Sequence, residues 1–495
     1  MMQSLASPGL NLSPTSILIL ISITTIIFIL LRKHHQAQAL SRLHNCAPAP
    51  NENDRFRYDF LGLFKALELA YHFRQKTSLP YTNALFLRYG ETYTSHVLTF
   101  RLTFTCNAEN TKRILSTAFS DFDSSPLRKP LFEPITPHGI FTLDGAGWKK
   151  SREQLRTRLA NLRKIIDLKL CEQHFQAFLK HVPPAGQLFD IQACAFALSL
   201  DMQTRFSLGE SVDALSFTQS PEKNQFLDDL LFVKERIVQD GFRGPLRHLF
   251  SKRRFLQSCR RARQYVIDHV TRDMERRSSG KEKHTDEEIA QSADQALSIL
   301  LANDSMSTTL SGLFYCLAQD KRVVKKLRAS IIDTIGLDPP TWSQLGSLHY
   351  VRWVLQEAMR LYPPVVLNAR IANKPTTLPT GGGPSLTSPI LIQKNEIIVF
   401  STWARHRLGT DFGPLPETFS PERWQSLSAD MIGFIPFNKG PRVCPGQHYA
   451  TIVLTYLVTR MFQTFEKVED YNVLPWEERI SMTFENGNGV LVGLS

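Results

Sequence analysis

A ten-residue segment around Cys444, residues 437–446 (F-N-K-G-P-R-V-C-P-G), constrains this chain more than any other. Gly440 and Gly446 give a backbone that bends tightly and lets a flat group approach closely, which a side chain at either position would obstruct. Arg442 supplies a fixed cation two residues before the cysteine. The residues that follow predict a helix start, whose free N–H groups favour a nearby thiolate. The segment therefore predicts a thiolate ligand held against a large flat cofactor.

The other cysteines define no second site. The seven cysteines of the chain are scattered along it, at Cys46, Cys106, Cys171, Cys194, Cys259, Cys316 and Cys444. None belongs to a C-x-x-C pair, which argues against a disulfide framework or a zinc site and in favour of a reducing compartment. The alternative for Cys444 is a buried free cysteine in a glycine-containing turn, which is a common use of this residue.

The formal net charge of +12 raises the question of nucleic-acid binding. The densest basic cluster lies in residues 252–263 and is interrupted by Phe255 and Leu256, a pattern typical of a solvated helix face. No nucleic-acid motif accompanies it, and a basic surface serves equally well for an acidic electron-donor protein or for anionic lipid. We therefore expect no nucleic-acid partner.

The residues from Thr15 to Leu31 contain no charged side chain, and as a helix they would span roughly 25 Å, close to a bilayer's hydrocarbon core. Basic residues begin at Arg32, so the positive-inside rule places the rest of the chain in the cytosol. A cleaved signal peptide is the alternative, and residues 37–39 (A-Q-A) imitate a cleavage site. Because the charges lie on the wrong side of the apolar run, we predict a single transmembrane anchor at 15–31.

The rest of the chain divides into a linker and one large domain. Residues 32–55 are basic at their start and contain prolines, which predicts a linker. In residues 56–495 helical periodicity dominates, and no repeat or low-complexity tract interrupts it. Strands are expected at 369–372 and within 389–400. The sequence thus predicts a mostly helical domain with a smaller β-rich part.

A helix expected from Lys149 to about Lys164 places two hydrogen-bond donors side by side. Trp148 and Arg152 are four residues apart, so they share a helix face and can present an indole N–H and a guanidinium together. Two such donors suit a carboxylate.

A second amphipathic helix, from Val351 to Tyr362, ends before two prolines and carries Glu357 and Arg360 on one face. Buried charges persist only when they are paired, so these two residues are expected to form a structural ion pair. The segment P-E-R-W with Arg423 follows later in the chain.

Residues 285–320 predict a helix of roughly 50 Å, whose start has capping-box spacing at Thr285 and Glu288. Its middle, residues 302–309 (A-N-D-S-M-S-T-T), places acid, hydroxyl and amide groups inside an otherwise apolar helix. Such residues favour caps and turns over helix interiors, so their presence needs a reason. A solvated face is one explanation, and a chemical role is the other.

These motifs and their order resemble the cytochrome P-450 superfamily over essentially the whole chain. The cysteine-loop pattern of that superfamily, F-x-x-G-x-R-x-C-x-G, is matched at Phe437, Gly440, Arg442, Cys444 and Gly446. The resemblance implies a mostly α fold with a smaller β-rich part. It also implies haem b as the cofactor, with Cys444 as the axial thiolate ligand of the iron.

The resemblance assigns further roles. The pair Trp148 and Arg152 resembles the superfamily's W-x-x-x-R, which contacts a haem propionate, and Arg442 and Arg370 are expected to add cations there.

The order of Glu357, Arg360 and Arg423 resembles the superfamily's Glu-Arg-Arg lock, a structural trio.

As a member of this superfamily the chain would be a monooxygenase on the endoplasmic-reticulum membrane, with its catalytic domain in the cytosol. It would take electrons from NADPH-cytochrome P-450 reductase, use O₂ and oxidise a hydrophobic small molecule. Several motifs resemble the fungal alkane and fatty-acid hydroxylase branch, and on that resemblance one hypothesis is terminal hydroxylation of a long aliphatic chain. Because fold and branch do not fix the substrate, oxidation of a fungal secondary metabolite is the preferred hypothesis. A haem-binding protein or an oxygen-independent isomerase is a third alternative.

The long helix of the superfamily carries A-G-x-D-T-T, and two registers are open here. Counting back from the helix end places the acid at Asp304 and the hydroxyl at Ser305. The other register matches Thr308 and Thr309 to the threonine pair, but it leaves Ser307 in place of the acid. We favour the first register, in which a hydroxyl beside a carboxylate relays protons through water. Thr308 lies one turn from Asp304 and could share the relay.

Overall fold

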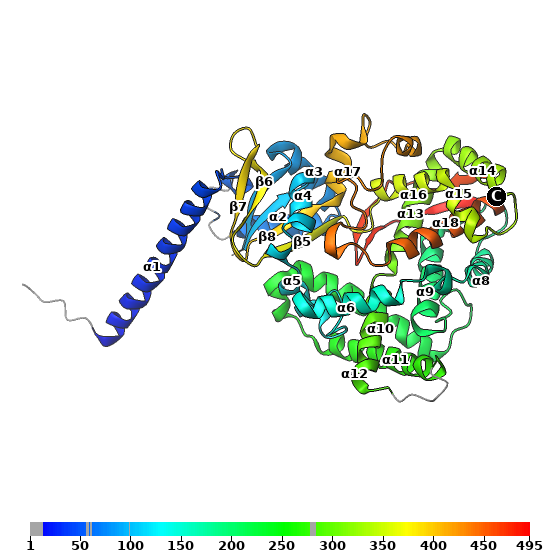
Figure 1. The fold of residues 1–495 in the computed structure, drawn as a ribbon, viewed down its shortest axis with the longest axis horizontal. Coiled ribbons are helices and arrows are strands. Elements are labelled where there is room, and N and C mark those ends of the chain that lie inside the picture. Colours follow the sequence, from blue (N-terminus) through cyan, green and yellow to red (C-terminus); the bar gives the residue numbers. More distant parts are fainter. Residues whose placement is uncertain (1–12, 56–58, 60–61, 99, 278–283) are drawn as a thin grey trace, which may run out of the picture.

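The computed structural model describes residues 13–55, 59, 62–98, 100–277 and 284–495. In this part of the chain a helical body adjoins a smaller sheet-rich part, and the helix α1 (Pro14–Leu43) projects from the sheet-rich end beside β6 and β7 (Figure 1). The mostly helical architecture with a smaller β part is the one that the sequence predicts. The helix α1 is apolar and long enough to cross a membrane, and none of its most apolar window is buried.

The helices that follow α1 are α2 (Leu63–Arg74), α3 (Ser78–Tyr89), α4 (Ala108–Lys112), α5 (Ser125–Phe132), α6 (Gly145–Arg158), α7 (Leu162–Ile165), α8 (Leu168–Leu179), α9 (Ile191–Leu208), α10 (Pro221–Arg243), α11 (Arg253–Arg277), α12 (Asp286–Leu301), α13 (Asp304–Gln319), α14 (Lys321–Ile335), α15 (Trp342–Ser347), α16 (His349–Leu361), α17 (Thr402–Leu408) and α18 (Gln447–Thr464). The strands are β1 (Thr92–Val97), β2 (Phe100–Thr105), β3 (Phe122–Asp123), β4 (Leu188–Asp190), β5 (Leu367–Ala372), β6 (Thr376–Gly382), β7 (Ser388–Ile392), β8 (Ile397–Ser401), β9 (Val468–Asp470), β10 (Glu478–Ile480), β11 (Phe484–Asn486) and β12 (Leu491–Leu494).

The largest apolar core surrounds α13. This helix is buried along nearly its whole length, and it packs against α9, α16 and α18. Leu310, Leu313 and Phe314 are buried in that core, and the Phe314 ring stacks on Phe462 of α18 with centroids 5.9 Å apart. An apolar core of this size holds the elements around it in fixed positions.

The larger sheet has the strand order β1-β2-β8-β5-β3, in which β2 and β8 are parallel and the other neighbours antiparallel. Hairpins β6–β7 and β10–β11 and a three-stranded sheet β4-β12-β9 complete the strands of the described residues. The strands predicted at 369–372 and within 389–400 are confirmed as β5, β7 and β8. Asn395, with φ 70°, forms the turn between β7 and β8, since Asn tolerates the left-handed region.

The prediction of one continuous helix over residues 285–320 is wrong. The capping box of Thr285 and Glu288 is present, but α12 ends at Leu301 and α13 begins at Asp304. At the break, the carbonyl oxygen of Asn303 accepts a hydrogen bond from Ser199 Oγ of α9 at 2.9 Å. Tertiary contacts therefore satisfy backbone groups that a continuous helix would have paired internally.

The helix expected from Lys149 to Lys164 is also divided. The first helix, α6, begins earlier, at Gly145, and ends at Arg158. The second, α7, starts after Asn161, whose side chain caps it by accepting from the N–H of Lys164 at 3.2 Å. Asn favours such N-cap positions, and this explains the early stop.

The segment 32–55, expected as a linker, lies in α1 as far as Leu43 and then against the sheets. The N–H of Ala47 donates to the carbonyl of Pro389 at 2.9 Å, and the N–H of Thr94 donates to the carbonyl of Pro50 at 2.8 Å. The expected first residue of the large domain, Phe56, lies outside the described residues. This segment thus joins α1 to the sheet-rich part through backbone hydrogen bonds.

We expect the buried ion pair between Glu52 and Lys65 to make this attachment a measurable part of the stability. The two side chains are fully buried, with Nζ and Oε2 2.7 Å apart. Glu52→Ala should lower the free energy of unfolding by about 3–5 kcal/mol, because it leaves a buried ammonium without that partner. The matched control is Glu109→Ala, which removes an exposed pair with Lys112 and should cost less than about 1 kcal/mol. Equal losses in denaturant titrations of the two variants would contradict this account.

Candidate active site

The segment around Cys444 forms a tight loop between the short helix η7 (Gly440–Arg442) and α18. The N–H of Cys444 donates to the carbonyl of Phe437 at 2.8 Å, which closes the loop. Burial raises the pKa of the Cys444 thiol, whereas a hydrogen bond from the N–H of Gly446 and the charge of Arg152 act to lower it. The sulfur therefore has donors and a cation to stabilise a thiolate but lacks the full solvation that water would give.

The two glycines of the loop serve different ends. Gly440 has φ +67°, and a Cβ there would collide with the carbonyl oxygen of Leu115, so glycine is needed for the chain to turn and approach η2 (Arg113–Thr117). At Gly446 a Cβ would find, among the described residues beyond its own neighbours, nothing nearer than Cys444 Sγ at 3.9 Å. The protein itself thus leaves room beside the sulfur, as a flat ligand bound there would require.

Three buried or nearly buried guanidinium groups gather near this loop. They belong to Arg128 of α5, Arg370 of β5 and Arg442 of η7. Asn368 Oδ1 accepts from Arg128 Nη2 at 2.9 Å and from Arg370 Nη1 at 3.2 Å. Burial lowers the pKa of Arg128 to about 10 and that of Arg370 well below its usual value, and neighbouring arginines lower both further. Such a cluster is stable only with an anionic partner.

Asp144, at the start of α6, supplies part of that negative charge. It forms an ion pair with Arg442 Nη2 and accepts from the N–H groups of Ser124 and Ser125. Asp123 also lies near Arg442, but two carboxylates do not balance three guanidinium groups. The arrangement therefore favours a further anion with more than one carboxylate.

Trp148 and Arg152 of α6 lie against the cysteine loop, as their shared face predicts. The guanidinium of Arg442 stacks over the Trp148 ring, with its central carbon 4.5 Å from the ring centroid. Arg152 Nη1 donates to the carbonyl of Val443 at 2.6 Å. The structure thus brings Trp148, Arg152 and Arg442 together with Cys444.

Arg128 is the member of this group that sequence reasoning missed. A single arginine in the short segment S-P-L-R-K-P carries no motif. Its burial beside Arg370 depends on the packing of α5 against β5, which no local pattern reveals.

The structure also brings Glu357, Arg360 and Arg423 together. Arg360 Nε and Nη2 donate to the two oxygens of the Glu357 carboxylate at 2.9 and 2.8 Å, in a bidentate pair with no exposed side-chain surface. Arg423 Nε donates to the same carboxylate at 2.8 Å, and so does Trp424 Nε1 at 2.9 Å. Trp424 is a fourth member that the sequence did not single out.

The candidate relay residues lie at the start of α13 and point to different partners. Asp304 forms a buried ion pair with Lys234 of α10, with Nζ and Oδ1 2.7 Å apart. Thr308 is buried and donates to Thr483 Oγ1 at 2.9 Å. Ser305 is half-buried, and its N–H donates to the carbonyl of Ala302, an exposed residue of the break, at 3.3 Å. Ser305 is thus partly exposed, whereas Thr308 is enclosed by protein.

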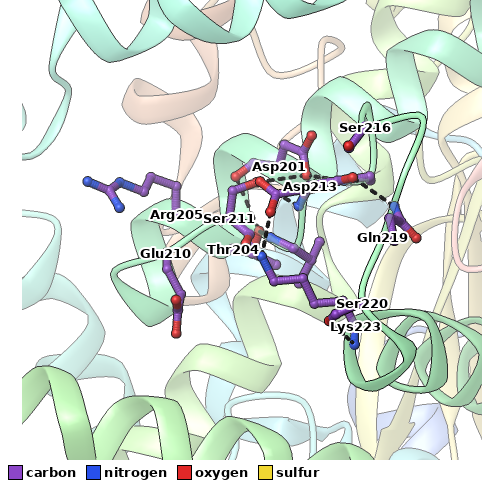
Figure 2. A network of polar contacts seen from close by, with 12 residues as sticks. Asp201, Thr204, Arg205, Glu210, Ser211, Asp213, Ser216, Gln219, Ser220 and Lys223 are labelled. Carbon is purple, nitrogen blue, oxygen red and sulfur yellow. Dashed lines mark hydrogen bonds and ion pairs between the residues drawn. The ribbon is translucent and has the colours of Figure 1, made fainter.

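The loop between α9 and α10 leads into the helix that carries Lys234. Asp201 of α9 accepts from Ser211 Oγ at 2.8 Å and from the N–H groups of Ala214 and Leu215 at 2.6 and 2.9 Å (Figure 2). Lys223, in the first turn of α10, donates to the carbonyl of Ser211 at 2.9 Å. The loop is thereby attached to α9 and to the first turn of α10, and the packing of α10 on α11 and α5 continues to the part of the helix that carries Lys234.

The family model described as Cytochrome P450 matches residues 63–286 and 251–486, which together cover most of the chain. The chain belongs to the cytochrome P450 family. Members of this family bind haem through a cysteine thiolate and act as oxidoreductases on O₂ and a substrate, with a redox partner.

Several curated proteins are similar to this cytochrome P450 over most of its length. Cytochrome P450 monooxygenase fsdH of Fusarium heterosporum is 31% identical over 479 residues, which cover 91% of this chain and 83% of that protein. Cytochrome P450 52A13 of Debaryomyces hansenii is 30% identical over 484 residues, covering 91% and 92%. Cytochrome P450 monooxygenase himC of Aspergillus japonicus is 34% identical over 425 residues, covering 82% and 76%. The chain is therefore a cytochrome P450 monooxygenase by family.

The residues around Cys444 fit the family's cofactor. Haem b is flat, carries two propionates and needs one thiolate ligand. The room beside Gly446, the thiol of Cys444 and the surplus of guanidinium groups at Arg128, Arg370 and Arg442 match these three properties in turn.

We predict that Arg128→Met weakens haem binding about 10- to 100-fold, since a charge-assisted hydrogen bond contributes about 1.5–3 kcal/mol. Haem transfer to an excess of an apo-globin measures this affinity. The control is Lys129→Met, which removes the adjacent exposed cation and its pair with Glu133, and it should leave haem transfer unchanged. A normal transfer rate in Arg128→Met would exclude Arg128 from the propionate site.

Proposed function

We propose that Cys444 is the axial ligand of haem b and that Arg128, Arg152, Arg370 and Arg442, with Trp148, hold its propionates. The observation that carries this proposal is the surplus of buried guanidinium charge beside a thiol that accepts a backbone N–H. Bound there, haem supplies oxygen activation with electrons from a redox partner. The residues of this chain supply the ligand, the charge balance and the exclusion of water.

The proposed electron donor is an NADPH-dependent cytochrome P450 reductase, and the proposed location is the endoplasmic-reticulum membrane. The apolar, exposed α1 supports a single anchor in residues 15–31, with the catalytic domain of residues 56–495 on the cytosolic side. The basic residues directly after the apolar run support that orientation.

The proposed reaction is oxidation of a hydrophobic small molecule, preferably a fungal secondary metabolite. Terminal hydroxylation of a long-chain alkane or fatty acid is the alternative. The preference rests on the fact that neither the fold nor the branch fixes the substrate. A spectral binding screen of the purified enzyme, with fatty acids compared against polyketide and terpenoid extracts, distinguishes the two. Tight binding confined to fatty acids would reverse the preference.

We predict that Cys444→Ser abolishes the thiolate-type absorption band of the reduced carbon monoxide complex, because a serine hydroxyl does not supply a thiolate. The control is Cys194→Ser, at a half-buried cysteine outside the loop, and it should keep that band. Retention of the band in Cys444→Ser would overturn the proposed function as a whole.

The proposed proton relay uses Asp304 and Ser305, with Thr308 in a supporting position. Ser305 is only half-buried, while the Thr308 hydroxyl is engaged by Thr483. A relay group must reach the reacting atoms directly or through one water, and this requirement favours Ser305. The ion pair with Lys234 holds the Asp304 side chain in place one residue away.

We expect Ser305→Ala and Asp304→Asn to lower the product formed per NADPH consumed, whereas Thr308→Ala changes it little. Removing a proton-transfer group typically costs about 10²- to 10⁴-fold in the step that it serves, so uncoupling should be pronounced. Product and NADPH are measured in the same reaction, at matched haem content. Strong uncoupling in Thr308→Ala alone would select the other register, and full coupling in all three variants would remove the relay from α13.

A further inference from the structure

The side chain of His406, in α17, spans the gap between α16 and the segment that leads into the cysteine loop. Its Nδ1 lies 3.1 Å from the carbonyl oxygen of Arg360, the last-turn residue of α16. Its Nε2 accepts a hydrogen bond from the N–H of Ile435 at 3.0 Å. The ring is fully buried, so water does not compete for either bond.

These two bonds define the protonation state of the ring. A backbone N–H can only donate, so Nε2 must be the unprotonated nitrogen. A carbonyl can only accept, so Nδ1 carries the proton. His406 therefore serves its two neighbours only as the neutral Nδ1–H tautomer. A second proton on Nε2 would place two donors against each other at Ile435.

The contact with Arg360 is reciprocal. Arg360 Nη1 donates to the carbonyl of His406 at 3.0 Å, while the His406 ring donates to the carbonyl of Arg360. Arg360 is itself held by Glu357 in a bidentate pair. The lock around Glu357 thus fixes both the backbone and the ring of His406.

The two ring hydrogen bonds of His406, called the His406 bridge below, lead at their other end to the thiol of Cys444. Ile435 is two residues before Phe437, whose carbonyl accepts from the N–H of Cys444 at 2.8 Å. The His406 ring also stacks on Phe434, with centroids 5.3 Å apart, and meets the edge of Phe412 at 5.7 Å. In the described structure His406 is thus the side chain whose two ring bonds connect the lock to the loop.

The charges around the ring oppose its protonation. Burial lowers the pKa of His406 well below its usual value, and the guanidinium groups of Arg360, Arg407 and Arg405 lower it further, while the hydrogen bond to the Arg360 carbonyl acts in the opposite sense. These cations are paired outside the ring with four carboxylates, those of Glu357, Glu91, Asp411 and Glu417.

We propose that His406 is a positioning residue for the cysteine thiolate, which transmits the rigidity of the Glu357–Arg360 pair to Ile435 and thereby to Cys444. The proposal rests on the proposed function in one respect, namely that Cys444 is the haem ligand. It further assigns an acid limit to the site. An unfolded histidine takes up a proton near pH 6.5, whereas the folded site holds His406 neutral, so the bridge is fully stable above that pH and loses stability as the pH falls below it.

The test compares His406→Phe and His406→Gln in the full-length holoenzyme. Phenylalanine keeps the ring packing on Phe434 but removes both nitrogens, so the thiolate-type band of the reduced carbon monoxide complex should convert largely to the thiol-type band at pH 7.5. Glutamine keeps an acceptor for Ile435 without titrating. This variant should keep the thiolate-type band at pH 7.5. Because glutamine does not titrate, the fraction of enzyme with the thiol-type band should rise less steeply than in the wild type below about pH 6.5, by up to tenfold per pH unit. Amide hydrogen exchange at Ile435 should rise in the Phe variant and stay near wild type in the Gln variant.

His349→Gln is the matched control, since His349 is exposed at the start of α16 and should leave spectrum and acid dependence unchanged. A wild-type band ratio and wild-type exchange at Ile435 in His406→Phe would overturn the proposal. If that variant fails to fold, the Gln variant decides alone, and full wild-type acid dependence in it would also overturn the proposal. These results are distinguishable from a failure of the proposed function, which would appear as a thiolate-type band in Cys444→Ser.

Discussion

The buried carboxylate of Glu357 is the constraint on which the loop around Cys444 depends. It accepts hydrogen bonds from Arg360, Arg423 and Trp424, and none of its surface reaches solvent. A charge buried in this way is tolerated only while all its partners remain, so the carboxylate holds α16 and η6 (Pro421–Gln425) together. The proposed His406 bridge extends that unit to Ile435. The stability of the lock and the geometry of the thiol are therefore linked, although they lie in different parts of the sequence.

The two sides of the site handle charge in opposite ways. Near the loop, Arg128, Arg370 and Arg442 lie near the carboxylates of Asp144 and Asp123, which leaves positive charge for a bound anion to neutralise. At the start of α13, by contrast, Asp304 and Lys234 already balance each other. Self-contained pairs suit a region that an apolar substrate enters, whereas an unbalanced cluster suits a region that an anionic cofactor completes.

Sequence reasoning succeeded where chemistry and spacing lie within one short segment. The loop around Cys444, the capping box at Thr285 and the apolar helix near the N-terminus are examples, because each is specified by neighbouring residues. It missed Arg128 and Lys234. Arg128 contacts Asn368, 240 residues away in the sequence, and Lys234 contacts Asp304, 70 residues away. A single buried cation has no local signature. Its partner is chosen by packing, which a pattern of hydrophobic residues does not resolve.

The break between α12 and α13 illustrates how such long-range contacts redirect a local pattern. By periodicity alone residues 285–320 form one helix, but the polar run that begins at Asn303 weakens helix propensity at its middle. Ser199 lies outside that segment, on α9, yet its hydroxyl donates to the Asn303 carbonyl. Lys234 of α10 donates to the side chains of Asn303 and Asp304. Two donor groups from two other helices thus make three hydrogen bonds at the break, one of them to a backbone carbonyl. The polar residues at the start of α13 and their partners on α9 and α10 are therefore joined where the local pattern alone predicts a continuous helix.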